Sequence, residues 1–173
     1  NPVWSPDGQW IAYQSSGGDT VSNFYKNGVI LKIAANGQGE PQPLAADIDE
    51  EVFNLHWTPR GMYALARQRT DQYVYEIDPK TGKSKTVMEN PDNVYALSFS
   101  QNGENLALQG RSATQLTEIY KTNTREWQPI AVSNMTQQIE GLKLGSSEVI
   151  QWESRDGTTI EGVLHKPADY DPA

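Results

Sequence analysis

The sequence contains no cysteine and only two histidines among its 173 residues. Without cysteine, disulfides, thiolate catalysis and thiolate metal sites are excluded. The same absence is compatible with the cytoplasm and with a bacterial periplasm, so the compartment stays undetermined. No apolar run approaches the roughly 18 residues that a membrane helix needs. We therefore expect no membrane-spanning helix and no thiol chemistry.

Positive charge is also scarce. The chain has 14 basic and 22 acidic residues, which gives a net charge of −8 at pH 7. Nucleic-acid binding needs lysine and arginine to neutralise phosphates, and anionic membrane surfaces attract basic segments. The balance of charges therefore indicates neither a nucleic-acid partner nor a membrane partner.

What the sequence does contain is a repeat. Each copy has an aromatic residue, then Ser or Thr, a variable pair and Gly, and an apolar strand follows each time. The copies read VWSPDG at 3–8, HWTPRG at 56–61 and SFSQNG at 98–103. Between them lie further β-rich runs, separated by Asn-Gly, Asp-Gly and Thr-Gly turns. Each unit thus holds four short strands, and no long stretch has helical periodicity.

Four strands every ~40–45 residues are typical of a β-propeller blade, whereas a two-sheet sandwich, the rival fold, needs no repeat. We predict an all-β partial propeller of about three four-stranded blades, with a C-terminal β-hairpin. The predicted blades are residues 1–47, 48–91 and 92–138. Residues 139–173 follow as a crossover hairpin, turning near residues 155–158, and a linker.

Three blades cannot close a ring, because propellers have about four to eight. Two expectations follow. The chain is a piece of a larger polypeptide, or copies pair as a homodimer through the open ends of the arc. Both can hold at once, because open sheet edges and apolar faces favour association.

The sequence offers few residues for chemistry. It has no Gly-x-Ser-x-Gly motif and no Walker-type phosphate loop. His56 and His165 lie on predicted strands without metal ligands nearby, and the acidic run at 47–51 has no EF-hand spacing. Ser5 and Asp7 could form a catalytic pair, but Asp7 is replaced by arginine and asparagine in the other copies, which favours a structural turn. We expect no catalytic residue, cofactor or metal site in this chain.

One arrangement of charged residues remains as a weak candidate for contact with substrate. Arg67 and Arg69 end the second strand of the middle unit, and Arg111 ends the equivalent strand of the third unit. In a propeller these strand ends point to the same rim. Arginines on one rim could hold a carboxylate in bidentate fashion, although solvated charges on an acidic protein are the simpler interpretation.

The repeats and the tail together resemble a known family. WSPDGQWIAY at 4–13 is similar to the repeat of TolB-like propellers, which also occurs in the propeller of prolyl oligopeptidase-family serine peptidases. Residues 148–172 resemble the crossover from propeller to α/β-hydrolase domain in the acylaminoacyl-peptidase and dipeptidyl-aminopeptidase branch. The positions that fit that crossover are Ser154, Asp156, Gly157, Ile160, Gly162, Pro167, Tyr170, Asp171 and Pro172.

The resemblance implies a parent enzyme that cleaves short peptides with a Ser-Asp-His triad, while its propeller limits access to the hydrolase domain. The family's triad lies C-terminal to the crossover, so the resemblance places no catalytic residue here. The partners it implies are short peptides, through the parent enzyme, and the chain's own hydrolase domain. The alternative is a TolB-like periplasmic protein-binding propeller without enzymatic activity.

Overall fold

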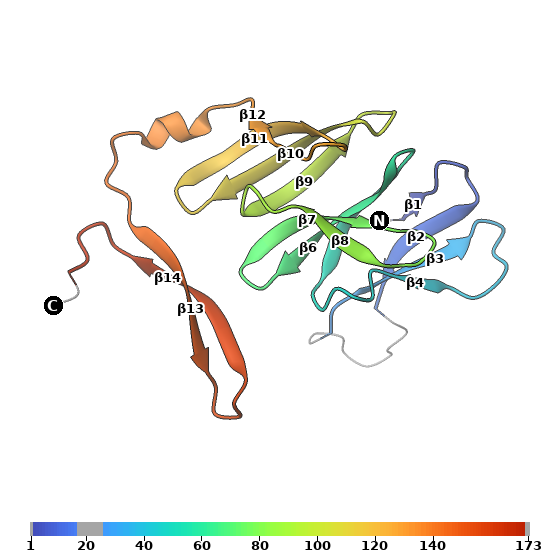
Figure 1. Cartoon of the computed structure of the whole chain (residues 1–173), viewed down its shortest axis with the longest axis horizontal. Helices are drawn as coiled ribbons and strands as arrows, with labels where there is room; N and C mark the ends of the chain where they lie inside the picture. Colours follow the sequence, from blue (N-terminus) through green and yellow to red (C-terminus); the bar gives the residue numbers. More distant parts are fainter. Residues whose placement is uncertain (1, 17–25, 172–173) are drawn as a thin grey trace.

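The fold consists of antiparallel β-sheets, as the repeat predicts (Figure 1). The computed structural model describes residues 2–16 and 26–171. Three groups of four strands follow one another along the chain. The first group is β1 (Val3–Trp4), β2 (Trp10–Ser15), β3 (Val29–Ala34) and β4 (Gln42–Leu44). The second is β5 (Val52–Thr58), β6 (Gly61–Gln68), β7 (Asp71–Ile77) and β8 (Ser84–Met88). The third is β9 (Asn93–Phe99), β10 (Asn105–Ser112), β11 (Gln115–Asn123) and β12 (Ile130–Ala131).

The three groups are arranged as blades around a common centre. Their first strands lie next to one another, β1 beside β5 and β5 beside β9. Within each group every strand pairs antiparallel with the next. A single parallel bridge, Gln72 to Asn93, joins the second group to the third. The prediction of an all-β partial propeller with about three four-stranded blades is confirmed. We call the groups blades one, two and three.

Two hydrophobic clusters hold the blades together, one on each side of blade two. Met62, Ala64 and Ala66 of β6 pack toward blade one, while Leu65 packs toward blade three. All of these side chains have no exposed surface. Because alternate residues of a strand point to opposite faces, the apolar run MYALA in β6 fits a strand that is covered on both faces.

The aromatic residue of each repeat packs toward the preceding blade. Trp57 packs against the cluster between blades one and two, and Phe99 packs against the cluster between blades two and three. Trp4 occupies the same place in blade one and is 59% exposed. Since no described strand lies on that side of blade one, the aromatic residue has its expected position but no partner there.

The repeated Ser-x-Asx-Gly stretch is a side-chain-stabilised turn. The Ser5 hydroxyl donates to Asp7 Oδ1 at 2.6 Å and accepts the Trp10 amide at 2.8 Å. Ser100 and Asn102 repeat the first of these bonds at 2.7 Å. Such local bonds are the usual reason for Ser and Asx in turns. They show that Ser5 and Asp7 form the structural turn that the repeat predicts.

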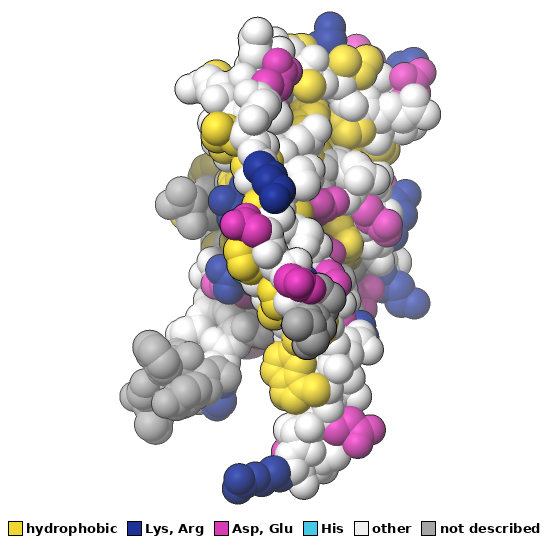
Figure 2. Space-filling model, turned by 90° about the vertical axis from the view of Figure 1, so that its left-hand side faces the viewer, with side chains coloured by type: hydrophobic (Ala, Val, Ile, Leu, Met, Phe, Trp, Pro, Cys, Tyr) yellow, Lys and Arg dark blue, Asp and Glu magenta, His cyan; other side chains and the backbone are white. Residues whose placement is uncertain are grey.

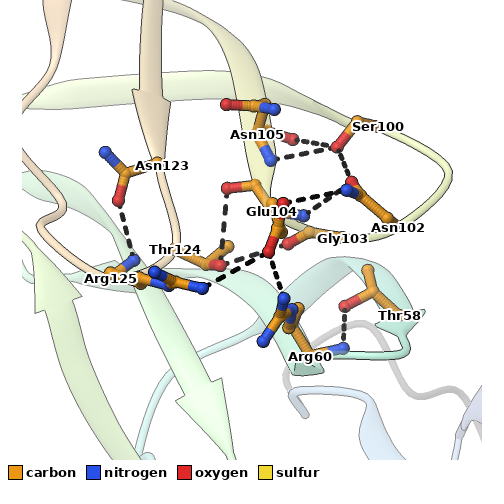
Figure 3. Close-up of polar contacts among 10 residues, drawn as sticks. All are labelled: Thr58, Arg60, Ser100, Asn102, Gly103, Glu104, Asn105, Asn123, Thr124 and Arg125. Carbon is orange, nitrogen blue, oxygen red and sulfur yellow. Dashed lines mark hydrogen bonds and ion pairs between the residues drawn. The ribbon is translucent and has the colours of Figure 1, made fainter.

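In blade two the turn is shorter, and arginine stands in place of Asx. Arg60 reaches across to Glu104 of blade three, whose carboxylate also pairs with Arg125 at 3.4 Å (Figure 3). Between blades one and two, the Lys32 ammonium donates to the Pro79 carbonyl at 2.5 Å. Polar bridges thus join both pairs of neighbouring blades beside the hydrophobic clusters.

After β12 the chain leaves the blades through a short 3-10 helix, η1 (Met135–Ile139), and forms the hairpin β13 (Ser146–Glu153) and β14 (Thr159–Lys166). The hairpin projects from the edge of the three blades (Figure 1). Seen from the hairpin's side, hydrophobic side chains lie open to solvent between charged ones (Figure 2). Those on the hairpin include Val149, Trp152 and Val163, each at least 44% exposed.

The hairpin turn repeats the turn chemistry of the blades. Ser154 donates to Asp156, and the Gly157 amide donates to the Ser154 carbonyl. Pro172, the last position of the predicted crossover pattern, lies outside the described residues. Among residues 2–16 and 26–171, no helix is long and apolar enough to cross a membrane.

Candidate functional site: the arginine rim and the crossover hairpin

The three candidate arginines lie on one rim of the propeller. Arg67 pairs with Gln72, Gln72 with Asn93, and Asn93 with Arg111, so a single row crosses β6, β7, β9 and β10. Three strand spacings of ~4.8 Å place the Cα atoms of Arg67 and Arg111 roughly 14 Å apart. Arg69 lies just beyond β6, in the turn to β7, with φ 55°. We call this edge the arginine rim.

Two of these arginines have carboxylate partners within the chain. Arg67 Nη1 lies 3.7 Å from Glu51 Oε2, and Arg69 Nη1 lies 3.3 Å from Glu161 Oε2. The Arg111 guanidinium instead lies over the Tyr95 ring, 5.2 Å from its centroid. The structure therefore brings the arginines to one rim but directs them to three different partners. Their contact with substrate stays a prediction.

The rim between the arginines is acidic. Burial and the neighbouring Asp71, which accepts the Tyr73 hydroxyl at 3.0 Å, raise the pKa of Tyr73 to about 12. Glu89 and Asp92 act on Tyr73 in the same direction. Negative charge around a phenol disfavours its ionised form. Since the surroundings are acidic, anionic groups would bind this rim only through the arginine side chains themselves.

The remaining polar candidates have structural partners. Asp47, from the acidic run at 47–51, accepts the Ser84 amide at 2.9 Å, and this bond lowers the pKa of Asp47. His56 Nε2 lies 2.9 Å from Asn54 Oδ1, and burial lowers the pKa of His56. Within the described ranges, no group of three His, Cys, Asp or Glu side chains could hold a metal ion.

Sequence reasoning missed Glu118, which anchors the start of the crossover. The Glu118 carboxylate accepts hydrogen bonds from the Ser133 hydroxyl, from the Thr136 hydroxyl at 2.7 Å, and from the amides of Met135 and Thr136 at 2.9 and 2.6 Å. These bonds, that of Ser133 first, lower the pKa of Glu118 to about 2. Asn134, at the N-cap of η1, makes no side-chain capping bond. Glu118 therefore satisfies amides that the helix start leaves open.

A signal for Glu118 was present in the sequence. The side chains of β11 alternate, and Glu118 lies on the same buried face as Tyr120 and Thr122. A carboxylate at an inward position of an alternating strand needs a compensating hydrogen-bond network. The position could therefore have been singled out, although its partners fifteen and more residues away could not.

Glu161 is the second functional carboxylate that the sequence did not reveal. It lies on β14, and its side chain is only 15% exposed. It accepts hydrogen bonds from Arg69, from Thr70 at 3.4 Å, and from Gln151 at 2.9 Å. Gln151 is its cross-strand neighbour within the hairpin. Glu161 thus links the hairpin to the β6–β7 turn of blade two.

A cleft of about 340 Å³ lies where the base of the hairpin meets blade three. It is lined by Thr114 and Leu116 around the β10–β11 turn, by Ile139 of η1, and by Ser147 and His165 of the hairpin. His165 Nδ1 lies 2.6 Å from Ser147 Oγ. The hairpin therefore faces the rim at two points, at blade three beside this cleft and at blade two through Glu161.

Comparison with known proteins agrees with this fold. No family model matches the chain. The chain is 25% identical over 173 residues to dipeptidyl-peptidase 5 of Porphyromonas gingivalis, which covers 98% of this chain and 25% of that protein. The crystal structure of puromycin hydrolase has a TM-score of 0.70 at 13% identity, covering 96% of this chain and 25% of that one. The structure of the AtxE2 isopeptidase has a TM-score of 0.69 at 16% identity, and the match covers 95% of this chain and 25% of that one.

The chain resembles the propeller segment of prolyl oligopeptidase-family peptidases. The resemblance inferred from the repeats and the crossover is thereby confirmed. The chain spans about a quarter of the length of the relative that it matches. TolB from Acinetobacter baumannii shares the fold, with a TM-score of 0.59 at 15% identity over 95% of this chain and 40% of that one.

Proposed function

We propose that this chain is the non-catalytic propeller segment of a serine peptidase that cleaves short peptides. Its role is to shape and limit the entrance to a hydrolase domain that follows the crossover. The observation that carries the proposal is the match to a dipeptidyl-peptidase, which covers the three blades as well as the crossover. The contact of Glu161 on the hairpin with Arg69 supports it, because this contact brings the crossover beside the arginine rim.

The chain's own side chains fit a supporting role rather than a chemical one. The described histidines lie on separate elements, β5 and β14. Catalysis by a serine needs a base and oxyanion donors that converge on one point. Ser147 and His165 are in contact, but both lie on the exposed hairpin. In this proposal the chain therefore contributes the arginine rim and the crossover to the intact peptidase, and it contributes no catalytic residue.

The proposal is tested by comparing this chain with the full-length protein in the same assay. Chromogenic dipeptide and acyl-peptide substrates should be cleaved by the full-length protein and left intact by the 173-residue chain. Replacing the serine of a downstream Gly-x-Ser-x-Gly motif with alanine should abolish the full-length activity. Turnover by the 173-residue chain alone, or an inactive full-length protein, would contradict the proposal.

The second candidate is a TolB-like protein-binding propeller without an enzyme. The TolB likeness over 95% of this chain supports it, although at 15% identity that likeness concerns the fold. The coding sequence downstream of residue 173 discriminates between the two. A hydrolase pattern there favours the peptidase, and a stop codon soon after residue 173 favours the binding protein.

A further inference from the structure

We propose that the crossover hairpin is a hinged strap, and that Glu161 is the latch that holds it against blade two. The proposed strap has three parts. Glu118 fixes its start, residues 140–145 form its hinge, and Glu161 binds its far part to the rim. The latch rests on the contacts in this chain and not on the proposed function.

The start of the strap is held firmly. Each oxygen of the Glu118 carboxylate accepts two hydrogen bonds, and the side chain is buried. Charge-assisted hydrogen bonds of this kind are stronger than neutral ones. Residues 133–136 are therefore fixed to blade three, and movement of the hairpin has to begin after η1.

The segment after η1 has the features of a hinge. Gly141 adopts φ 83°, a conformation that glycine reaches without strain. At Gly145 the backbone packs so closely on the Lys166 carbonyl that an added Cβ would lie 2.2 Å from its oxygen, so the hinge ends where the hairpin begins. Between them Leu142 is 61% exposed. Hinges are a few loop residues that absorb a change of backbone angles.

The latch consists of one carboxylate and two donors from blade two. Among the described residues, the hydrogen bonds that join the hairpin strands to the blades are those from Arg69 and Thr70 to Glu161. Their lengths, 3.3 and 3.4 Å, and the 63% exposure of Arg69 indicate a contact that can open. Gln151 keeps Glu161 in place from within the hairpin.

The latch also explains the place of Arg69. Its φ of 55° is unusual for a residue with a side chain, and glycine would suit the backbone better. Arginine at this turn directs a cation to the only partly exposed Glu161. In this proposal Arg69 is a positioning residue for the crossover.

Because the chain has no cysteine, spin labels can be placed at chosen sites. Exposed Lys80 of blade two and Arg155 of the hairpin turn are replaced by cysteine and labelled, away from the latch. Electron–electron double resonance then gives the distribution of distances between the labels. We expect one narrow distribution at low ionic strength. Glu161→Ala or Arg69→Gln should broaden it, as should about 1 M salt, which shortens the screening length to ~3 Å.

Two control variants separate a latch from a general loss of structure. Glu153→Gln, an exposed carboxylate on the same hairpin, should leave the distribution narrow. The charge swap Arg69→Glu with Glu161→Arg should restore a narrow distribution, which a merely structural effect of either residue would not do. Unchanged circular dichroism in all variants shows that the blades remain folded.

Two results would overturn the latch. One is a distribution that stays narrow in Glu161→Ala, and the other is a broad distribution in the unmodified pair at low salt. Neither result bears on peptidase activity, which the full-length assay measures separately. Either result, obtained together with peptide cleavage by the full-length protein, would refute the latch and leave the proposed function standing.

Discussion

Blades two and three place different residues at the same point of their second strands. Counted from the residue that pairs with the aromatic of each repeat, Leu65 of β6 and Gln109 of β10 are equivalent. Leu65 has no exposed surface, whereas Gln109 is exposed. Blade three covers the face that carries Leu65, and no described element covers the face that carries Gln109. The comparison shows that a side chain at this position is buried when a following blade covers it, and that its place in the repeat alone does not determine its burial.

The faces of β6 and β10 that point toward the preceding blade are buried in both strands. Met62 and Ala64 pack toward the blade before them, and Leu106 and Leu108 do the same in blade three. Each blade is therefore apolar on the side that meets its predecessor. The faces that point toward the following blade differ between the two strands. This face is apolar in β6, whereas in β10 its residues are small or polar and include Ala107 and Gln109.

The largest expected effect comes from exchanging the two residues of this comparison. Leu65→Gln removes apolar packing and buries an amide without partners, so we expect a loss of about 3–5 kcal/mol in the free energy of unfolding. Gln109→Leu should change it by less than about 0.5 kcal/mol. Urea unfolding followed by tryptophan fluorescence measures both. Similar losses in the two variants would mean that the face bearing Gln109 is covered after all.

A smaller effect is expected from the buried carboxylate of blade three. Its hydrogen bonds hold the pKa of Glu118 near 2, below the ordinary value of 4.5. A group with a lowered folded pKa stabilises above its unfolded pKa, and this stabilisation is lost as the pH falls through the folded pKa. The free energy of unfolding should therefore decrease between pH 5 and pH 2, and less steeply in Glu118→Gln.

The free energy of unfolding should still depend on pH in Glu118→Gln, because hydrogen bonds also lower the pKa of Asp7 and Asp47. Glu153→Gln, which replaces an exposed hairpin carboxylate, serves as the control and should keep the full slope. Equal slopes in Glu118→Gln and the unmodified chain would show that the carboxylate is not held as described.

The bridge between blades two and three should contribute less. The side chains of Arg60 and Glu104 are 45% and 36% exposed, and exposed ion pairs contribute about 0–1 kcal/mol. Arg60→Ala should lower the free energy of unfolding by at most about 1 kcal/mol in low salt and by less in 1 M salt. Arg155→Ala, at the hairpin turn, is the matched control. A decrease in the free energy of unfolding well above about 1 kcal/mol would indicate that Arg60 also stabilises the conformation of the turn at residues 58–61.

The smallest effect concerns association of copies, which was expected from the open arc. The exposed face of blade three includes Ala107, Gln109 and Ile119 around a shallow groove of about 170 Å³. Light scattering at increasing concentration should show weak self-association that Gln109→Leu strengthens and Ile119→Glu reduces. A constant monomer mass in all three proteins would remove this face from consideration as a homodimer interface.

Much of the fold could be predicted because its signals are local. Turn residues such as Gly8 and Gly103 mark strand ends, and the aromatic residues mark the blades. Strand alternation gave the hairpin and placed Arg67 and Arg111 at corresponding strand ends. These features depend on a few neighbouring residues, so one sequence suffices to read them.

The partners of the rim could not be predicted, because they depend on pairs distant in sequence. Glu161 meets Arg69 across 92 positions, and Glu118 meets Thr136 across 18. Nothing in the local pattern of either strand specifies such a partner. The contact of the hairpin with blade two depends on the first of these pairs, and the attachment of η1 to blade three depends on the second.

The hairpin turn at Ser154 and Asp156 has a consequence for recognising related chains. Its Ser-x-Asx-Gly bonds are the ones found at Ser5 and Ser100, yet the hairpin is no blade. A search that counts this motif would take the hairpin for a blade and would miss blade two, where Arg60 stands in place of Asx. The residue before the serine distinguishes the cases, since it is aromatic in the blades and Glu153 in the hairpin. Blade numbers in such sequences are best counted by the aromatic and the turn together.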